Sequence, residues 1–215
     1  MSEPTPAASP TLISAPSPPP FAALVVDRVA NQLRAAPDFA GPVAANFTSV
    51  IQAVVWFLSA RLASPKPYMR EDGKAAQALE RDLQEDLFEW LKSGALLQGV
   101  PIYEPQQVAG GRADIMIVIN GQSIVSELKR ETEDASRGAL QDTYSRQASS
   151  YDAVDYPFGI VTVLDVVDPP SATPRLDECV WVHSVDYGEA GKRWLVFIRV
   201  PGRRRTPAEQ TGSAQ

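Results

Sequence analysis

Two carboxylates and one lysine lie on two strand-like runs of residues. Asp114 belongs to Arg112–Ile119, whereas Glu127 and Lys129 belong to Gln122–Lys129. Carboxylate oxygens are ligands that Mg²⁺ accepts while it keeps several waters. An ammonium group can orient a water molecule or stabilise negative charge that develops on a phosphate. Together these residue types could form a metal-dependent hydrolytic site, provided that the fold brings them to one place.

The turn between the two runs predicts that they meet. Asn120-Gly121 is a dipeptide that strongly favours a two-residue type I′ hairpin turn. Counting outward from this turn places Asp114 directly opposite Glu127, with their Cβ atoms about 5 Å apart. Lys129 follows Glu127 by two positions and therefore shares its face of the strand.

Two carboxylates that face each other repel, so the arrangement costs stability unless a positive charge offsets it. A divalent cation would supply that charge, and we expect a Mg²⁺ site here. The alternative is an ion pair on an exposed sheet face, because Glu-x-Lys is a common pattern. The apolar residues of the same run pair, Met116, Val118 and Val125, favour the metal site.

The segments Gly111–Ile115 and Ser126–Lys129 resemble the PD-(D/E)XK nuclease superfamily, which includes restriction endonucleases and RecB-type nuclease domains. Ala113 stands where the superfamily's name-giving motif has a proline, a position that varies widely within it. The resemblance covers roughly residues 74–166.

The resemblance implies a restriction-endonuclease-like mixed sheet flanked by helices, and hydrolysis of a nucleic-acid phosphodiester with DNA favoured over RNA. It implies that Asp114 and Glu127 bind Mg²⁺, for which Mn²⁺ could substitute, and that Lys129 helps to activate water. It also implies a site-facing glutamate on the helix before the hairpin. We favour Glu80 for this role, followed by Glu85; the alternative is that these acids solvate an outer helix face.

Downstream of the hairpin, Asp134–Val154 has the spacing of a helix. Gln147 and Tyr151 lie one turn apart on it, and they resemble the Gln-Tyr signature that RecB-like members place beside the site. Phe158–Val166 is a continuous apolar run, which predicts a buried strand parallel to the strand of Glu127.

Three arginines are candidate phosphate contacts, because a guanidinium makes charge-assisted hydrogen bonds. They are Arg112, Arg130 and Arg146. The net charge of −6 is not typical of a nucleic-acid-binding domain. Many basic residues come late in the chain, however, so a locally basic face is compatible with the acidic total. Each arginine could equally be a solvated surface charge.

Composition and spacing predict four segments along the 215 residues. Residues 1–20 hold seven of the 19 prolines and predict a disordered tail. Residues 21–66 predict an N-terminal helical extension. Residues 67–200 predict the nuclease-like α/β domain, and residues 201–215 a flexible C-terminal tail.

Three helices are predicted before the hairpin: Phe21–Ala36, Val43–Ala63 and Gly73–Lys92. The first two could pack on each other and on the sheet, or they could present a surface for a homodimer or a partner subunit. Loss of self-association in a chain that begins at about Tyr68 would favour the second alternative.

The single cysteine, Cys179, excludes an intrachain disulfide and fits a reducing compartment. A catalytic pair with the only histidine, His183, is disfavoured because no third group orients it. Polar residues interrupt the longest apolar stretch, Val50–Leu62, so we predict no membrane span. No secretory signal is visible, and we expect a cytoplasmic protein.

The main alternative to a nuclease is a catalytically silent relative that keeps the fold to bind nucleic acid or to assemble with proteins. The acidic net charge favours this alternative. The complete set of Asp114, Glu127 and Lys129 argues against it. A site that had lost its activity would not be expected to retain two like charges that face each other, because they repel.

Overall fold

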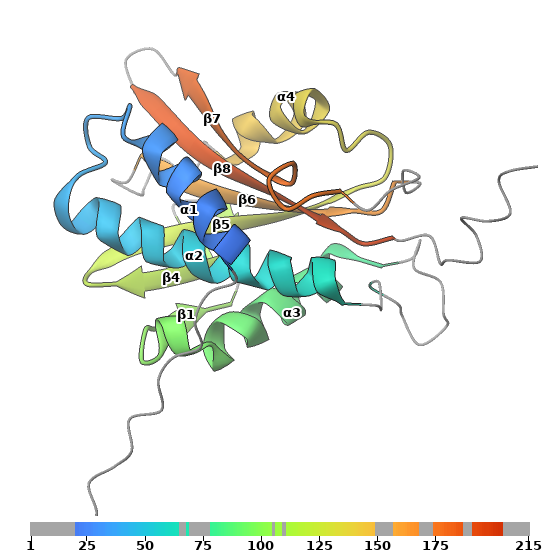
Figure 1. Cartoon of the computed structure of the whole chain (residues 1–215), viewed down its shortest axis with the longest axis horizontal. Helices are drawn as coiled ribbons and strands as arrows, with labels where there is room; N and C mark the ends of the chain where they lie inside the picture. Colours follow the sequence, from blue (N-terminus) through green and yellow to red (C-terminus); the bar gives the residue numbers. More distant parts are fainter. Residues whose placement is uncertain are drawn as a thin grey trace, which may run out of the picture.

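The computed structural model describes residues 20–64, 68, 78–104, 106–108, 111–148, 157–167, 174–186 and 191–203. Within these residues the protein is built around a six-stranded mixed sheet that helices cover on both faces (Figure 1). The predicted α/β class with a mixed central sheet is thereby confirmed.

The described strands are β1 (Ile102–Tyr103), β2 (Gln106–Val108), β3 (Gly111–Ala113), β4 (Ile115–Ile119), β5 (Gln122–Glu131), β6 (Phe158–Asp165), β7 (Val180–Asp186) and β8 (Lys192–Pro201). The main sheet has the order β1-β4-β5-β6-β8-β7, and β2 and β3 form a separate two-stranded sheet. β6 pairs in parallel with β5, as predicted, and also with β8. The other neighbouring strands of the main sheet pair in antiparallel fashion.

The described helices are α1 (Pro20–Leu33), α2 (Gly41–Ala63), α3 (Glu80–Ser93), the 3₁₀ turn η2 (Ala95–Leu97) and α4 (Arg137–Ala148). Side chains alternate across a strand, so β6 contributes to two layers. Ile160 and Leu164 share a core with α1, α2 and α3 on one face. Val161 and Val163 pack with Leu140 of α4 on the other face.

The hairpin of β4 and β5 forms in the predicted register. Asn120 and Gly121 have φ angles of 50° and 78°, which is the left-handed backbone that a type I′ turn requires. Pairing runs outward from the turn as far as Ile115, which faces Ser126. Asp114 is the residue directly before β4, beyond the last of these pairs.

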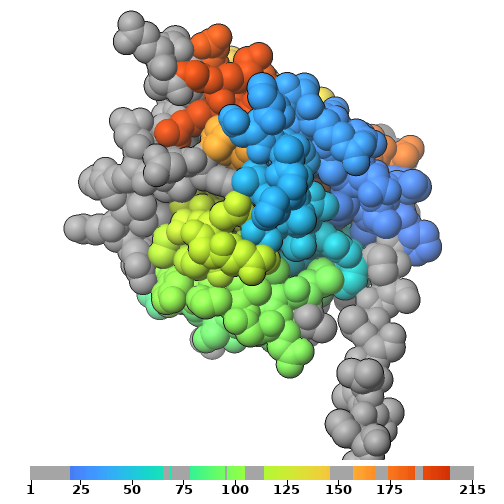
Figure 2. Space-filling model, turned by 90° about the vertical axis from the view of Figure 1, so that its left-hand side faces the viewer, coloured from blue at the N-terminus to red at the C-terminus, as the bar shows by residue number. Residues whose placement is uncertain are grey.

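Helix α2 holds the hairpin turn from the side. The buried Asn46 of α2 donates from its amide nitrogen to Gln122 Oε1 at 2.6 Å and accepts from Asn120 Nδ2 at 2.9 Å. Figure 2 shows the yellow-green end of the hairpin beside the light-blue start of α2. The register is therefore supported from outside the hairpin as well as by its own turn.

The helices of the predicted extension, residues 21–66, share the core of the sheet. Phe47 of α2 lies with its ring centroid 5.5 Å from that of Phe158 in β6. By length and composition α2 is the one described helix that could cross a membrane. Half of its most apolar 18-residue segment is buried inside this fold. On α1, Phe21 and Leu24 stay exposed.

Arg112–Ile119 is not one continuous strand, in contrast to the prediction. It breaks at Asp114 into β3, which pairs with β2, and β4, which pairs with β5. A continued strand would use the Ala113 carbonyl to accept the Leu128 N–H. The Asp114 carboxylate accepts that N–H at 2.8 Å, so the backbone can leave the main sheet at this point.

The predicted start of helix α3 was Gly73, but the helix begins at Glu80. The Leu79 N–H donates to the Asp82 carboxylate at 2.7 Å, which is the type of contact that starts a helix. Residues 78 and 79 before it are not helical, and residues 73–77 lie outside the described part of the chain.

Helix α4 begins at Arg137, three residues later than predicted. Ser136 is its N-cap, because its hydroxyl accepts the Ala139 N–H at 3.4 Å. The predicted continuation over residues 149–154 lies outside the described residues. At the other end of the chain, α1 ends at Leu33 and not at Ala36.

Replacing Asn46 tests the support of the hairpin turn. Asn46→Ala is expected to lower the free energy of unfolding by about 1–3 kcal/mol, because the side chains of Asn120 and Gln122 lose a buried partner. Urea denaturation measures this change. The matched variant Asn31→Ala, at an exposed position of α1, should change it by less than about 0.5 kcal/mol. Equal effects of the two variants would contradict the role of Asn46.

Candidate metal centre

Strand β5 carries two side chains of the candidate metal centre, and the break between β3 and β4 carries the third. Lys129 Nζ lies 3.2 Å from Glu127 Oε2 and 3.8 Å from Asp114 Oδ2. On β6 the partners of Glu127 and Lys129 are Val161 and Val163. The three side chains therefore come together on the face that α4 covers, as predicted, although the paired positions of β4 and β5 end at Ile115 and Ser126, one residue short of Asp114 and Glu127.

The backbone of β5 orients Asp114. Its Oδ2 atom accepts the Leu128 N–H at 2.8 Å, which fixes the direction of the carboxylate beside Lys129. Carboxylates that bind metals are commonly held in this way by a hydrogen bond from a neighbouring group.

The charged side chains are largely buried. Exposed fractions are 13% for the side chain of Asp114, 4% for Glu127 and 19% for Lys129. The alternative of an ion pair on a solvent-exposed sheet face is thereby excluded. Charges in such an environment interact more strongly than at the surface, and removal of one partner is correspondingly costly.

The donor set suits a hard divalent cation. Two carboxylates carry a formal charge of −2 against +1 for Lys129, and their oxygens are the ligand type that Mg²⁺ prefers. Within the described ranges no third Asp, Glu, His or Cys joins them in a group that could hold a metal. Mg²⁺ commonly takes one or two carboxylates and completes its shell with waters and substrate phosphate, so a pair of carboxylates is compatible with such a site.

The structure also describes two further predicted site residues, Glu80 and Arg130. Glu80 is the half-buried first residue of α3 and does not join Asp114 and Glu127 in a metal-binding group. Arg130 follows Lys129 and therefore lies on the other face of β5. Its Nε donates there to the Ala78 carbonyl at 2.6 Å. Arg130 thus supports the chain before α3 through its Nε, and its role as a phosphate contact stays a prediction.

The other predicted site residues fall partly or wholly outside the described residues. Arg112 lies in β3, and Arg146 and Gln147 lie in α4, but nothing is described of their side chains. Tyr151 is outside the described part altogether. The roles of these four residues stay predictions.

A link between β5 and α4 was not predicted. Tyr144 Oη donates to Glu131 Oε2 at 3.0 Å, and Glu131 Oε1 accepts the N–H groups of Thr132 and Glu133. Burial alone would raise the pKa of Glu131, but these donors outweigh it and hold the pKa below its usual value. Burial, followed by the hydrogen bond to Glu131, raises the pKa of Tyr144 to about 12, so its hydroxyl stays a donor. Glu131 lies two residues after Lys129 and therefore shares its face of β5. This spacing could have indicated from the sequence that Glu131 lies near the centre.

Charged groups also meet at the carboxyl ends of β6 and β8. Arg199 Nη1 donates to the Ala135 carbonyl at 3.1 Å, and its Nε lies 4.0 Å from Asp165 Oδ2. Burial raises the pKa of Asp165, which is the β6 partner of Glu131. In α/β sheets ligands bind outside the carboxyl ends of the strands. The position of Asp165 at the end of the apolar run of β6 could therefore have marked it in the sequence as a candidate site residue.

Cys179 and His183 do not form a catalytic pair. Burial raises the pKa of the Cys179 thiol to about 11, which keeps it protonated near neutral pH. Burial also lowers the pKa of His183. Four residues of extended chain span about 13 Å, which is too far for a contact between the two side chains.

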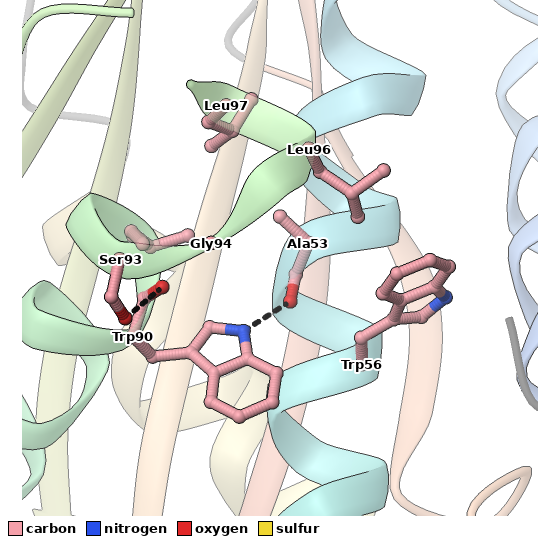
Figure 3. A pocket seen from close by; sticks show the side chains of 8 residues that line it. Ala53, Trp56, Trp90, Ser93, Gly94, Leu96 and Leu97 are labelled. Carbon is pink, nitrogen blue, oxygen red and sulfur yellow. Dashed lines mark hydrogen bonds between the residues drawn. The ribbon is translucent and has the colours of Figure 1, made fainter. Parts of the chain in front are cut away.

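A separate apolar pocket of about 350 Å³ lies between α2, α3 and η2 (Figure 3). Trp56, Trp90 and Leu96 line it, and the Trp90 indole N–H donates to the Ala53 carbonyl at 3.2 Å. No charged side chain is among its described lining residues. The pocket therefore offers no hydrolytic chemistry, and the charged cluster on the other face of the sheet is the better candidate.

Comparisons with known proteins assign no family to this geometry. No model of a protein family matches the sequence, and no curated protein and no solved structure matches it. The function must therefore be argued from the residues themselves.

The stability that Glu131 contributes should depend on pH. Its folded pKa lies below the unfolded value, so the contribution is complete above about pH 4.5 and is lost as the pH falls through the folded pKa. Glu131→Gln is expected to lower the free energy of unfolding by about 1 kcal/mol near neutral pH, and by progressively less in acid. Guanidinium denaturation over this pH range measures the difference.

The control for this experiment is Glu133→Gln, which removes an exposed carboxylate nearby. It should leave the free energy of unfolding nearly unchanged at every pH. A loss from Glu131→Gln that stayed constant into acid would contradict the role of the ionised carboxylate.

Proposed function

We propose that this protein is a Mg²⁺-dependent nuclease of the PD-(D/E)XK kind, which hydrolyses phosphodiester bonds of nucleic acid and prefers DNA to RNA. One observation carries the proposal. Asp114, at the break between β3 and β4, and Glu127, on β5, converge on one largely buried face, and the Lys129 ammonium lies 3.8 and 3.2 Å from their oxygens.

The order of the elements supports the proposal. An acidic helix, α3, precedes the β4–β5 hairpin, and helix α4 leads from the hairpin to the parallel strand β6. The superfamily that the sequence resembles has the same order around its metal site. We therefore propose a restriction-endonuclease-like arrangement for this part of the chain.

Each residue of the centre has a chemical role in this proposal. Asp114 and Glu127 hold the cation through carboxylate oxygens. When bound, Mg²⁺ supplies a coordinated water of lowered pKa and offsets charge on the phosphate oxygens. The Lys129 ammonium donates to the attacking water or to the phosphate and so orients one against the other. Because the site is largely buried, these electrostatic contacts are strengthened.

Supporting roles are assigned to residues around the centre. We propose that Gln147 and Tyr151 act beside the site, that Glu80 supports it, and that Arg112 and Arg146 contact phosphates. The packing of α4 on the face of the centre favours the role of Gln147.

We also propose a cytoplasmic location and a protein partner. A free, buried cysteine fits a reducing compartment. The exposed apolar side chains of Phe21 and Leu24 on α1 favour a homodimer or a partner subunit that covers this helix.

The proposed activity is tested by cleavage of single-stranded and double-stranded DNA and of RNA. The wild-type protein should cut in the presence of Mg²⁺ or Mn²⁺ and should stop when a chelator removes the metal. Asp114→Asn, Glu127→Gln and Lys129→Ala should each lower the rate by about 100-fold or more, because each removes a group that acts on the reacting phosphate or water.

Lys192→Met is the control, because it removes an exposed lysine at the start of β8, away from the centre. It should cut like the wild-type protein. Cleavage that needs no metal, or that survives in the three site variants, would contradict the mechanism. Metal and nucleic-acid binding without any cleavage would favour the catalytically silent alternative.

A further inference from the structure

The Lys129 ammonium lies where a cation would meet both carboxylates. Its Nζ atom is 3.2 Å from Glu127 Oε2 and 3.8 Å from Asp114 Oδ2. Little of either carboxylate side chain is exposed, 4% for Glu127 and 13% for Asp114, so water screens their repulsion weakly. The ammonium thus supplies a positive charge that offsets the repulsion between the two carboxylates.

We propose that Lys129 holds the cation position of the metal-free protein and competes with the divalent cation for Asp114 and Glu127. This inference rests on the proposed metal site, and it adds a second role for Lys129 beside its role in hydrolysis. It means that the strand pair can fold before metal is bound, and that metal binding must displace the ammonium.

The competition follows from charge and from the mobility of the three groups. An ammonium and a divalent cation in contact with the same two oxygens repel each other strongly at about 4 Å. Asp114 is held by the Leu128 N–H, and Glu127 is packed within a central strand, so neither can move far. The flexible four-carbon stem of a lysine lets the ammonium withdraw instead.

Calorimetric titration with Mn²⁺ tests the competition in the full-length protein. Lys129→Met keeps most of the aliphatic stem and removes the charge, and it should bind Mn²⁺ about tenfold or more tightly than the wild-type protein. Lys129→Arg keeps the charge and should not bind more tightly than the wild-type protein. Lys192→Met, which removes an exposed charge elsewhere, should bind like the wild-type protein.

Thermal unfolding gives a second readout that does not depend on activity. Without metal, Lys129→Met should unfold at a lower temperature than the wild-type protein or Lys192→Met, because two buried carboxylates lose their counter-charge. Added Mn²⁺ should raise the unfolding temperature of Lys129→Met more than that of the wild-type protein. A Lys129→Met protein that folds only when Mn²⁺ is present would support the proposal in its strongest form.

Two outcomes overturn the inference, and they are distinguishable. If Lys129→Met binds Mn²⁺ no more tightly than the wild-type protein, the competition does not exist, while the metal site and the proposed nuclease function stand. If neither protein binds Mn²⁺, both the competition and the proposed metal site are wrong.

Discussion

The largely buried carboxylates of Asp114 and Glu127 lie beside one lysine and repel each other, and the structure around them depends on how that repulsion is offset. The hairpin turn at Asn120-Gly121 sets a register in which pairing runs as far as Ile115 and Ser126, directly beside Asp114 and Glu127. Asn46 of α2 holds that turn in place. The positive charge comes from Lys129, two positions along the same strand face. The geometry of the turn thus helps to form a compact charged centre, at which we propose that a hard cation binds.

Asp114 links the chemistry of this centre to the topology of the sheet. Its carboxylate takes the Leu128 N–H that a continued strand would bind with its backbone, and the chain therefore leaves the main sheet at this residue. The side chain that would bind metal is also the side chain that ends the pairing. Helix α4 covers the same face, anchored to β5 by the hydrogen bond between Tyr144 and Glu131.

The sequence predicts the parts of this arrangement that depend on local chemistry. Asn120-Gly121 selects the turn, and the period of two then determines which face Asp114, Glu127 and Lys129 share. It does not predict the strand break, because the break depends on a hydrogen bond between a side chain and a distant backbone group. For the same reason the contacts of Arg130 with Ala78 and of Tyr144 with Glu131 appear only in the folded chain.

The most direct test of the central claim is the anomalous diffraction of crystals grown with Mn²⁺. The claim predicts an anomalous peak bound by carboxylate oxygens of Asp114 and Glu127, with the Lys129 ammonium moved away from both. A well-ordered site without a peak, or Mn²⁺ bound by other residues while Lys129 keeps its present contacts, would contradict it.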